Sequence, residues 1–304
     1  MAEQASAPTV DLTVSIISFN TKDLLVNCLE SIYANTEGIS FEVIVVDNAS
    51  TDGSAEAVRT RFPQVRLIAN DRNLYFTKAH NQAIGVSAGR YVLILNSDTI
   101  LLPGTLEKMV QFMDAHPQAG AASCVFLNPD GTIWPSCWKF KTLSAVLWGL
   151  NIPLNLFPNA RARTEPRMLD WDRTTLREVD VVVDAFMMVR RGAIEEVGTY
   201  DETLLLYATE DDFCLRLKSA GWKIYHVPEA KIIHINRGSV DQVRLLTIQS
   251  IYRRDTVRFL RKHHGFGIAL IGNVIISLDL VIAGAYLFIK EMFQRDRGKR
   301  PERR

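Results

Sequence analysis

Short apolar runs recur along the first third of the chain. Residues 12–18 (LTVSIIS), 41–47 (FEVIVVD) and 91–95 (YVLIL) are almost entirely apolar and rich in β-branched side chains. Such runs predict strands, and the lack of alternating polar positions predicts that both faces of their sheet are covered. A fourth, weaker run at residues 65–69 fits the same pattern.

Amphipathic segments separate these runs. Residues 21–35 carry apolar side chains at helical spacing, with Thr21 as the candidate N-cap, and residues 53–62 and 79–87 also favour helices. The alternation of strand and helix through about residue 100 predicts an α/β fold of the doubly wound type. We therefore expect a mostly parallel sheet with helices on both faces.

Three polar clusters follow the predicted strands: residues 18–20 (SFN), 47–50 (DNAS) and 96–98 (NSD). Ligands of such sheets bind beyond the carboxyl ends of the strands, so we expect the clusters to form one binding site. Asp98 could hold a divalent cation whose other ligands are diphosphate oxygens, and Asp47 could accept the imide N–H of a uracil or thymine ring. Each carboxylate could equally serve as a cap of a turn or helix.

The pattern becomes irregular in the middle of the chain. Residues 128–180 hold five prolines and four of the five tryptophans, which favours a substrate loop or lid over a core layer. Regular structure is expected again over residues 179–189, in a helix at 193–197 and in a helix at 213–220 that ends at Gly221.

Three adjacent acids, Glu210, Asp211 and Asp212, precede this last helix. Acids favour a helix N-terminus, but three exceed what capping needs, so one of them is a candidate general base for an attacking hydroxyl. Repulsion within the cluster is expected to raise the pKa of one member unless a cation or Arg216 compensates. His234 follows the next apolar stretch and could be a metal ligand, a phosphate contact or a structural residue.

The C-terminal part is first apolar and then basic. Residues 266–289 contain Asp279 as their one charged residue, and a helix of about 24 residues at ~1.5 Å each could cross a hydrocarbon core of roughly 30 Å. Basic residues recur at 252–264 and 290–304, as in an interfacial helix and a cytoplasmic flank. Asp279 and Asn273 leave full spanning open, because a carboxylate at mid-bilayer costs on the order of 3 kcal/mol. A helix buried against the domain is the alternative.

The net charge of +1 conceals two unequal parts of the chain. Residues 240–304 have 13 basic and 6 acidic residues, a net charge of +7, whereas residues 1–239 have a net charge of −6. The basic part suits anionic lipid headgroups, and the low total argues against a nucleic acid partner. The four cysteines are scattered, which predicts neither a disulfide nor a zinc site and fits a reducing compartment. The first residues lack the pattern of a secretory signal, so we expect a short leader before the first strand.

Three common motifs are missing from the sequence. The chain has no G-x-G-x-x-G after the first run, no G-x-x-x-x-G-K-[ST] and no G-x-S-x-G. A dinucleotide-binding domain is therefore disfavoured, a P-loop is excluded, and a nucleophile elbow is absent.

Five ordered motifs carry a resemblance to a known family. They read VSIISFN, VIVVDNASTDGS, NLYFTKAHNQAIGVSAGRYVLILNSDT, FMMVRRGAIEEVGTYDE and YATEDDFCLRLKSAGWKIYHVPEAKIIH, and together they span about residues 12–264. The sequence resembles the family 2 glycosyltransferases, and within them the rhamnosyltransferase-like branch of bacterial envelope polysaccharide synthesis.

The resemblance implies a GT-A fold and an inverting, metal-dependent transfer of a sugar from a nucleotide-diphosphate sugar. By position in the motifs it assigns Ser18, Asn20, Asp47, Asn48, Asn73, Lys78, Asn81 and Ser97 to the donor nucleotide, Asp98 and His234 to Mg²⁺ or Mn²⁺, and Glu210, Asp211 and Asp212 to catalysis.

Three departures from the family pattern bear on these roles. Asn96 replaces the first carboxylate of the metal motif, so metal binding depends more on Asp98. Tyr75 and Lys78 stand in a segment that is often glycine-rich. Counting back from Arg216 puts Glu210 at the position of the base, whereas matching the letters T-E-D puts Asp211 there, and the letters favour Asp211 slightly.

The sequence thus predicts a glycosyltransferase domain over residues 1–239 and a membrane-associated part over residues 240–304. No Q-x-x-R-W sequence is present, so we expect one sugar, with rhamnose as a candidate, to be transferred to each lipid-linked or glycan acceptor. The expected location is the cytoplasmic face of the bacterial inner membrane. The alternatives are a non-catalytic nucleotide-sugar-binding scaffold and, less favoured because no glycine-rich basic loop follows the first strand, a nucleotidyltransferase.

Overall fold

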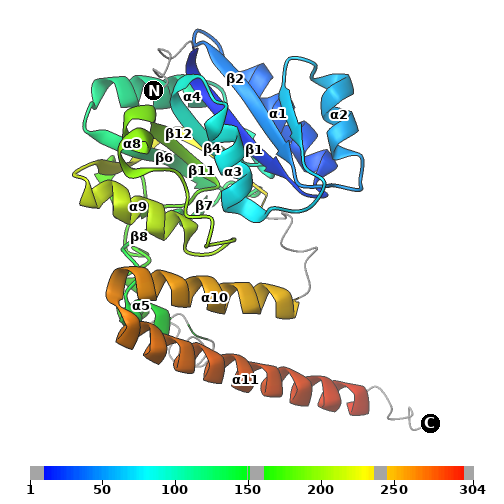
Figure 1. Ribbon diagram of the computed structural model, residues 1–304, viewed down its shortest axis with the longest axis vertical. Helices are drawn as coiled ribbons and strands as arrows, with labels where there is room; N and C mark the ends of the chain where they lie inside the picture. Colours follow the sequence, from blue (N-terminus) through cyan, green and yellow to red (C-terminus); the bar gives the residue numbers. More distant parts are fainter. Residues whose placement is uncertain (1–9, 149, 151–160, 236–244, 298–304) are drawn as a thin grey trace, which may run out of the picture.

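The apolar runs near the start of the chain form the parallel half of a sheet (Figure 1). A computed structural model describes residues 10–148, 150, 161–235 and 245–297. Its first strands are β1 (Val10–Ser18), β2 (Phe41–Asp47), β3 (Arg66–Ala69) and β4 (Gly89–Asn96), in the spatial order β3-β2-β1-β4. All three pairings among them are parallel, as the alternation of strands and helices predicts.

The second half of the chain extends this sheet with strands of both directions. The order continues from β4 through β11, β6 and β12 to β5, and β11 is antiparallel to both of its neighbours. The strands are β5 (Thr99–Leu101), β6 (Ala119–Leu127), β11 (Phe186–Arg190) and β12 (Lys223–His234), with β7 (Ile133–Trp134) and β9 (Arg177–Glu178) attached at the side and β8 (Cys137–Trp138) paired with β10 (Val181–Val182). The α/β fold is confirmed, with a mixed sheet.

Helices cover both faces of the sheet. The helices that the structure describes are α1 (Lys22–Asn35), α2 (Ser54–Arg61), α3 (Tyr75–Gly85), α4 (Thr105–Ala115), α5 (Leu143–Trp148), α7 (Arg161–Thr164), α8 (Arg191–Val197), α9 (Thr209–Ser219), α10 (Leu245–His264) and α11 (Phe266–Arg297). Of these, α10 and α11 lie away from the sheet (Figure 1). Alternate residues of β1 pack with α1 and α4 in one core, whereas β2 packs on α3, and β4 packs near α8 and α9 on the other side. The strands are therefore apolar on both faces.

Two helices begin about one turn earlier than the sequence pattern predicts. The helix expected at residue 79 begins at Tyr75, and the helix expected at residue 213 begins at Thr209. The three acids consequently form the first turn of α9 instead of preceding it, a place where the helix dipole favours negative charge. Thr21 does precede α1, but its hydroxyl lies 3.1 Å from that of Ser18 and makes no capping bond.

The last two helices lie side by side at one end of the molecule, with α11 outermost (Figure 1). In the part of the chain that the structure describes, no helix has the length and apolar character needed to cross a membrane. Asp279 is buried, and Asn273 accepts a hydrogen bond of 3.1 Å from Arg253 of α10. The expected leader at residues 1–9 and the end of the basic flank, residues 298–304, lie outside the described residues.

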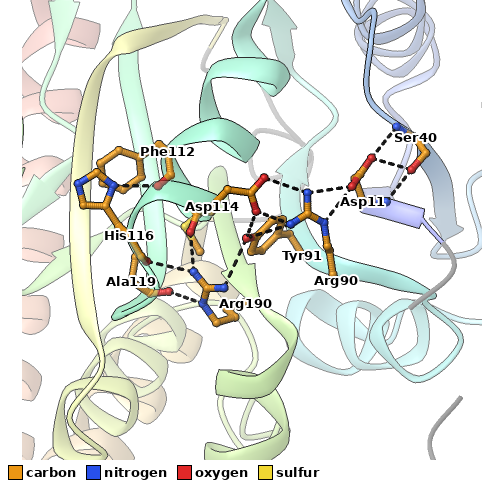
Figure 2. A network of polar contacts seen from close by, with 10 residues as sticks. Asp11, Ser40, Arg90, Tyr91, Phe112, Asp114, His116, Ala119 and Arg190 are labelled. Carbon is orange, nitrogen blue, oxygen red and sulfur yellow. Dashed lines mark hydrogen bonds and ion pairs between the residues drawn. The ribbon is translucent and has the colours of Figure 1, made fainter. Parts of the chain in front are cut away.

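A network of hydrogen bonds and ion pairs connects β1, β4 and β11 with the end of α4, at the amino ends of β1 and β4 (Figure 2). Arg90 donates to Asp11 at 2.9 Å and to both carboxylate oxygens of Asp114 at the end of α4. Tyr91 donates to Asp114 at 2.7 Å. Arg190 of β11 donates to three main-chain carbonyls around the end of α4. These bonds fasten α4 to the sheet at the edge opposite the carboxyl ends of the parallel strands.

Replacing Arg90 with Gln should lower the free energy of unfolding at pH 7 by about 1 kcal/mol, because the pairs are partly exposed. Hydrogen bonds from Arg90 lower the pKa of Asp114, so the stabilising pair is present above the ordinary aspartate pKa of 3.8 and is lost as the pH falls through the lowered value. Urea unfolding measures both effects. The matched control is Arg59→Gln, which removes an exposed pair on α2; equal losses in both variants would contradict the role given to the network.

Candidate functional site

The predicted polar clusters meet at the carboxyl edge of the sheet. Ser18 is paired with Asp47 across β1 and β2, and Asn96 lies opposite the residue before Ser18. Ser97 and Asp98 continue from the end of β4, and both are buried. The structure therefore places the three clusters side by side, as parallel strands require.

The loops at this edge have strained backbones. Asn20, Ala49, Tyr75 and Ala208 all have positive φ, between 54° and 63°, although none is glycine. A left-handed conformation costs a non-glycine residue roughly 1–2 kcal/mol, so neighbouring contacts must hold it. For Asn20 these contacts cross between loops: its N–H donates to the Ser50 hydroxyl at 2.9 Å, and its side-chain oxygen accepts from the Thr51 N–H at 2.7 Å.

Asp47 and Asn48 have different environments on the expected nucleotide side. One oxygen of Asp47 accepts the Ser50 N–H at 3.0 Å, and the other is buried without a hydrogen-bond partner among the described residues. That oxygen can accept the imide N–H of a pyrimidine. The amide of Asn48 instead donates to the Tyr75 carbonyl at 3.1 Å and accepts from Asn70, also at 3.1 Å, so it supports the loop before α3.

Of the three donor residues expected in or just before α3, two are engaged in contacts within the protein and one is exposed. Asn73 accepts the Tyr75 N–H at 2.8 Å and shapes the start of the helix. Asn81 donates to the Tyr200 carbonyl at 2.9 Å and accepts the Tyr200 N–H at 3.0 Å, which joins α3 to the loop before α9. Lys78 is exposed. Of this group, Lys78 therefore has a side chain that is accessible to a ligand.

Asp98 and His234 face one another at the end of the sheet. Asp98 Oδ1 and His234 Nε2 are 3.3 Å apart, both side chains are buried, and neither ring nitrogen of His234 has a hydrogen-bond partner among the described residues. One carboxylate and one imidazole fit two ligands of a divalent cation that takes its other ligands from diphosphate and water. The described residues contain no group of three potential ligands, so the donor would have to complete the site.

The first turn of α9 directs its three acids to different partners. Asp211 is fully buried, 3.0 Å from Lys141 Nζ and 3.4 Å from the Trp138 indole nitrogen. Asp212 accepts from Arg216 Nε at 2.9 Å. Glu210 is half-buried, and its Oε2 lies 2.9 Å from the Thr209 hydroxyl oxygen. Successive helical residues differ by about 100° in direction, which is why adjacent acids do not share partners.

The pKa values of the acids differ with these partners. Burial and the charge of Asp211 raise the pKa of Glu210, and Lys141 opposes this in part. Burial also acts to raise the pKa of Asp212, but hydrogen bonds from Lys262, His263 and Arg216 together lower it. Asp212 is thus held as a carboxylate, whereas Glu210 combines access to solvent with a raised pKa.

Two residues of this site, Asp184 and Lys141, were not predicted from the sequence. Asp184 accepts from the Thr209 hydroxyl at 2.7 Å, and burial together with the charge of Glu210 raises its pKa well above the usual range. A carboxylate inside the apolar run before FMMVRR was the available signal. Lys141 lies in the irregular segment, where no periodicity could have identified it.

Comparison with known proteins gives a consistent result. A family model described as glycosyl transferase family 2 matches residues 13–198. The chain is 29% identical over 234 residues to the N-acetylglucosaminyl-diphospho-decaprenol L-rhamnosyltransferase of Mycobacterium tuberculosis, covering 73% of this chain and 75% of the relative.

Two solved structures are similar in fold. The mannosyltransferase PcManGT from Pyrobaculum calidifontis, in complex with GDP-Man and Mn²⁺, has a TM-score of 0.56 at 19% identity, with 92% of this chain and 77% of that chain covered. GalNAc-T7 with UDP, GalNAc and Mn²⁺ has a TM-score of 0.58 at 14% identity, with 82% of this chain and 48% of that chain covered. At these identities the likeness shows the fold alone.

The geometry of Asp98 and His234 predicts cation-dependent nucleotide binding. Asp98→Asn and His234→Ala should each weaken the binding of UDP or dTDP in the presence of Mn²⁺ by about tenfold or more, because each removes one of the two side chains that would hold the cation. Titration calorimetry with and without Mn²⁺ measures this. His116→Ala, at the residue that follows α4, is the control. Nucleotide binding that is equally tight without a divalent cation would contradict the assignment.

Proposed function

Because the chain belongs to glycosyl transferase family 2 and is a glycosyltransferase, we propose that it transfers one sugar from a nucleoside-diphosphate donor to a lipid-linked diphosphate sugar. The first candidate for the sugar is L-rhamnose, because the Mycobacterium tuberculosis relative is named for transfer of this sugar to a diphospho-decaprenol acceptor. The missing Q-x-x-R-W sequence supports transfer of a single sugar.

The observation that carries the mechanism is the unequal compensation of the three acids. Lys141 forms an ion pair with Asp211, and Arg216 and Lys262 form ion pairs with Asp212, so both carboxylates are engaged by cations. Glu210 is half-buried and has a raised pKa, which suits a group that must accept a proton near neutral pH. We therefore assign the general base to Glu210, in place of the slight preference for Asp211 that the sequence letters gave.

The reaction is a single displacement with inversion at the anomeric carbon. Glu210 removes the proton of the acceptor hydroxyl while that oxygen attacks C1 of the sugar, and the nucleoside diphosphate leaves on the opposite face. Asp47 orients the base of the donor through its buried oxygen, which accepts no hydrogen bond from the described residues. A Mg²⁺ or Mn²⁺ ion held by Asp98 and His234 would supply charge stabilisation to the leaving diphosphate.

No observation favours the alternatives. A non-catalytic scaffold would not need an acid with a raised pKa beside a half-buried lysine, and both the family model and the Mycobacterium tuberculosis relative describe glycosyltransferases. The chain lacks the glycine-rich basic loop that a nucleotidyltransferase would place after β1.

We also propose that α11 rests on the cytoplasmic face of the bacterial inner membrane. Large apolar side chains are exposed along it at helical spacing: Phe266, Leu270, Ile271, Val274, Leu278, Val281 and Ile282. Asn273 and Asp279 lie on the other side of the helix, away from this row. An apolar face next to a basic helix suits a helix lying in the interface of an anionic bilayer.

Substitution of the acids tests the base. Glu210→Gln should lower kcat by a factor of about 10² to 10⁴, whereas Asp211→Asn should retain more activity. In the unmodified enzyme, kcat should fall on the acid side of its pH profile with an apparent pKa above the ordinary glutamate value of 4.5, since deprotonated Glu210 is the active form. Lys141→Gln should raise this apparent pKa by removing a cation, and Asp211→Asn should lower it by removing a like charge.

The assay follows sugar transfer to N-acetylglucosaminyl-diphospho-decaprenol with a panel of UDP-, GDP- and dTDP-sugars that includes dTDP-L-rhamnose. If Glu210→Gln stayed active and Asp211→Asn did not, the base would be Asp211. If no donor in the panel supported transfer by the unmodified protein, the proposed substrates would be wrong.

Membrane attachment has its own test. Leu270→Glu with Leu278→Glu should weaken binding to phosphatidylcholine–phosphatidylglycerol vesicles by at least about tenfold, because two exposed leucines lose their apolar contact. The matched control, Val86→Glu with Leu176→Glu, changes two exposed apolar residues of the body and should bind like the unmodified protein. Sedimentation with vesicles measures binding, and equal affinity of both pairs would refute the interfacial face.

A further inference from the structure

Helix α10 forms hydrogen bonds with the main chain that leads into α9, the helix that carries the three acids. Asp255 of α10 is fully buried, and its Oδ2 accepts three successive backbone N–H groups, from Leu205 at 2.9 Å, Leu206 at 2.9 Å and Tyr207 at 3.1 Å. Its other oxygen accepts from Arg254 at 2.9 Å. A buried carboxylate is costly unless such donors surround it, so this contact specifies one conformation of the loop.

The same loop is fastened from the opposite side by α3. The Thr77 hydroxyl donates to the Leu204 carbonyl at 2.6 Å, and the Phe76 N–H donates to the Leu205 carbonyl at 3.1 Å. The loop therefore uses its carbonyls toward the helix beside the donor site and its N–H groups toward α10. Ala208, which follows directly, has a φ of 59°, a conformation that its surroundings must enforce.

The C-terminal end of α10 contacts α9 itself. Lys262 Nζ lies 2.7 Å from Asp201 Oδ2 and 2.7 Å from Asp212 Oδ1, and His263 Nε2 also lies 2.7 Å from Asp212 Oδ1. Phe259 of α10 is buried against Ala208. Helix α10 thus contacts both the entrance and the first turn of α9.

We propose that Asp255 is a positioning residue for the transfer reaction: by fixing the backbone of residues 205–207, it sets the direction of the first turn of α9 and so the place of Glu210 against the acceptor hydroxyl. This inference rests on the proposed function of Glu210. It makes α10 part of the catalytic unit, so the functional boundary lies after residue 264 instead of at residue 239.

Packing alone would make α10 an inert support, and a matched pair of variants separates the two roles. Arg253 lies on the same helix but faces α11, where it donates to Asn273 at 3.1 Å. Arg253→Gln therefore disturbs the packing of α10 without touching the loop. Asp255→Ala removes the acceptor of all three N–H groups, whereas Asp255→Asn keeps one oxygen that can accept them.

The readout is the ratio of sugar transfer to hydrolysis of the donor by water, measured on the full chain with dTDP-L-rhamnose and N-acetylglucosaminyl-diphospho-decaprenol. This ratio does not depend on the folded fraction. Asp255→Ala should lower it by about ten- to hundredfold, because a misplaced base fails the bound hydroxyl more than it fails water. Asp255→Asn should recover most of the loss, and Arg253→Gln should leave the ratio unchanged.

Hydrogen exchange of the peptide spanning residues 201–209 supplies a readout that needs no activity. Exchange at residues 205–207 should rise in Asp255→Ala, rise less in Asp255→Asn and stay unchanged in Arg253→Gln. Unchanged exchange or an unchanged ratio in Asp255→Ala would overturn the proposal. If exchange rises as expected but the unmodified enzyme transfers no sugar, the contact is correct and the proposed function fails instead.

Discussion

The structure depends on how three adjacent carboxylates are compensated in the first turn of α9. Burying a charge is costly without a partner, and helical geometry sends the three side chains in different directions. Asp211 meets Lys141 from the irregular middle segment, and Asp212 meets Lys262 and His263 from α10. Two parts of the chain far from α9 in sequence, together with Arg216 of α9, therefore neutralise these two acids. Glu210, with no cation of its own in direct contact among the described residues, has the raised pKa.

The donor side is organised by the sheet edge and by loops that are held in strained conformations. Parallel pairing brings Ser18, Asp47 and the end of β4 together. Side-chain amides such as Asn48 and Asn81 then tie the loops to one another, so they support the site through protein contacts. Both α3 and α10 form hydrogen bonds with the loop before α9. The loop therefore links the donor site to the first turn of α9 and to α10.

The sequence predicted what depends on local periodicity and on motif order. The parallel strands, the α/β fold and the meeting of residues 18, 47 and 98 follow from apolar runs and from the rule that ligands bind at carboxyl edges. The antiparallel strand β11 and the role of Lys141 could not be predicted, because both depend on how residues 128–180 return to the sheet. The contacts of Asp255 and Lys262 could not be predicted either. The basic pattern of α10 indicated binding to lipid headgroups, whereas Lys262 forms an ion pair with Asp212 of α9.

The most direct test of this account is a ¹³C NMR titration of the carboxyl carbon of Glu210, assigned by its loss in Glu210→Gln. We expect this carboxyl to titrate above the ordinary glutamate pKa of 4.5 and Asp212 to titrate below the ordinary aspartate pKa of 3.8. A Glu210 carboxyl that titrates at or below 4.5, with Asp212 titrating above 3.8, would contradict the division of roles on which the mechanism is built.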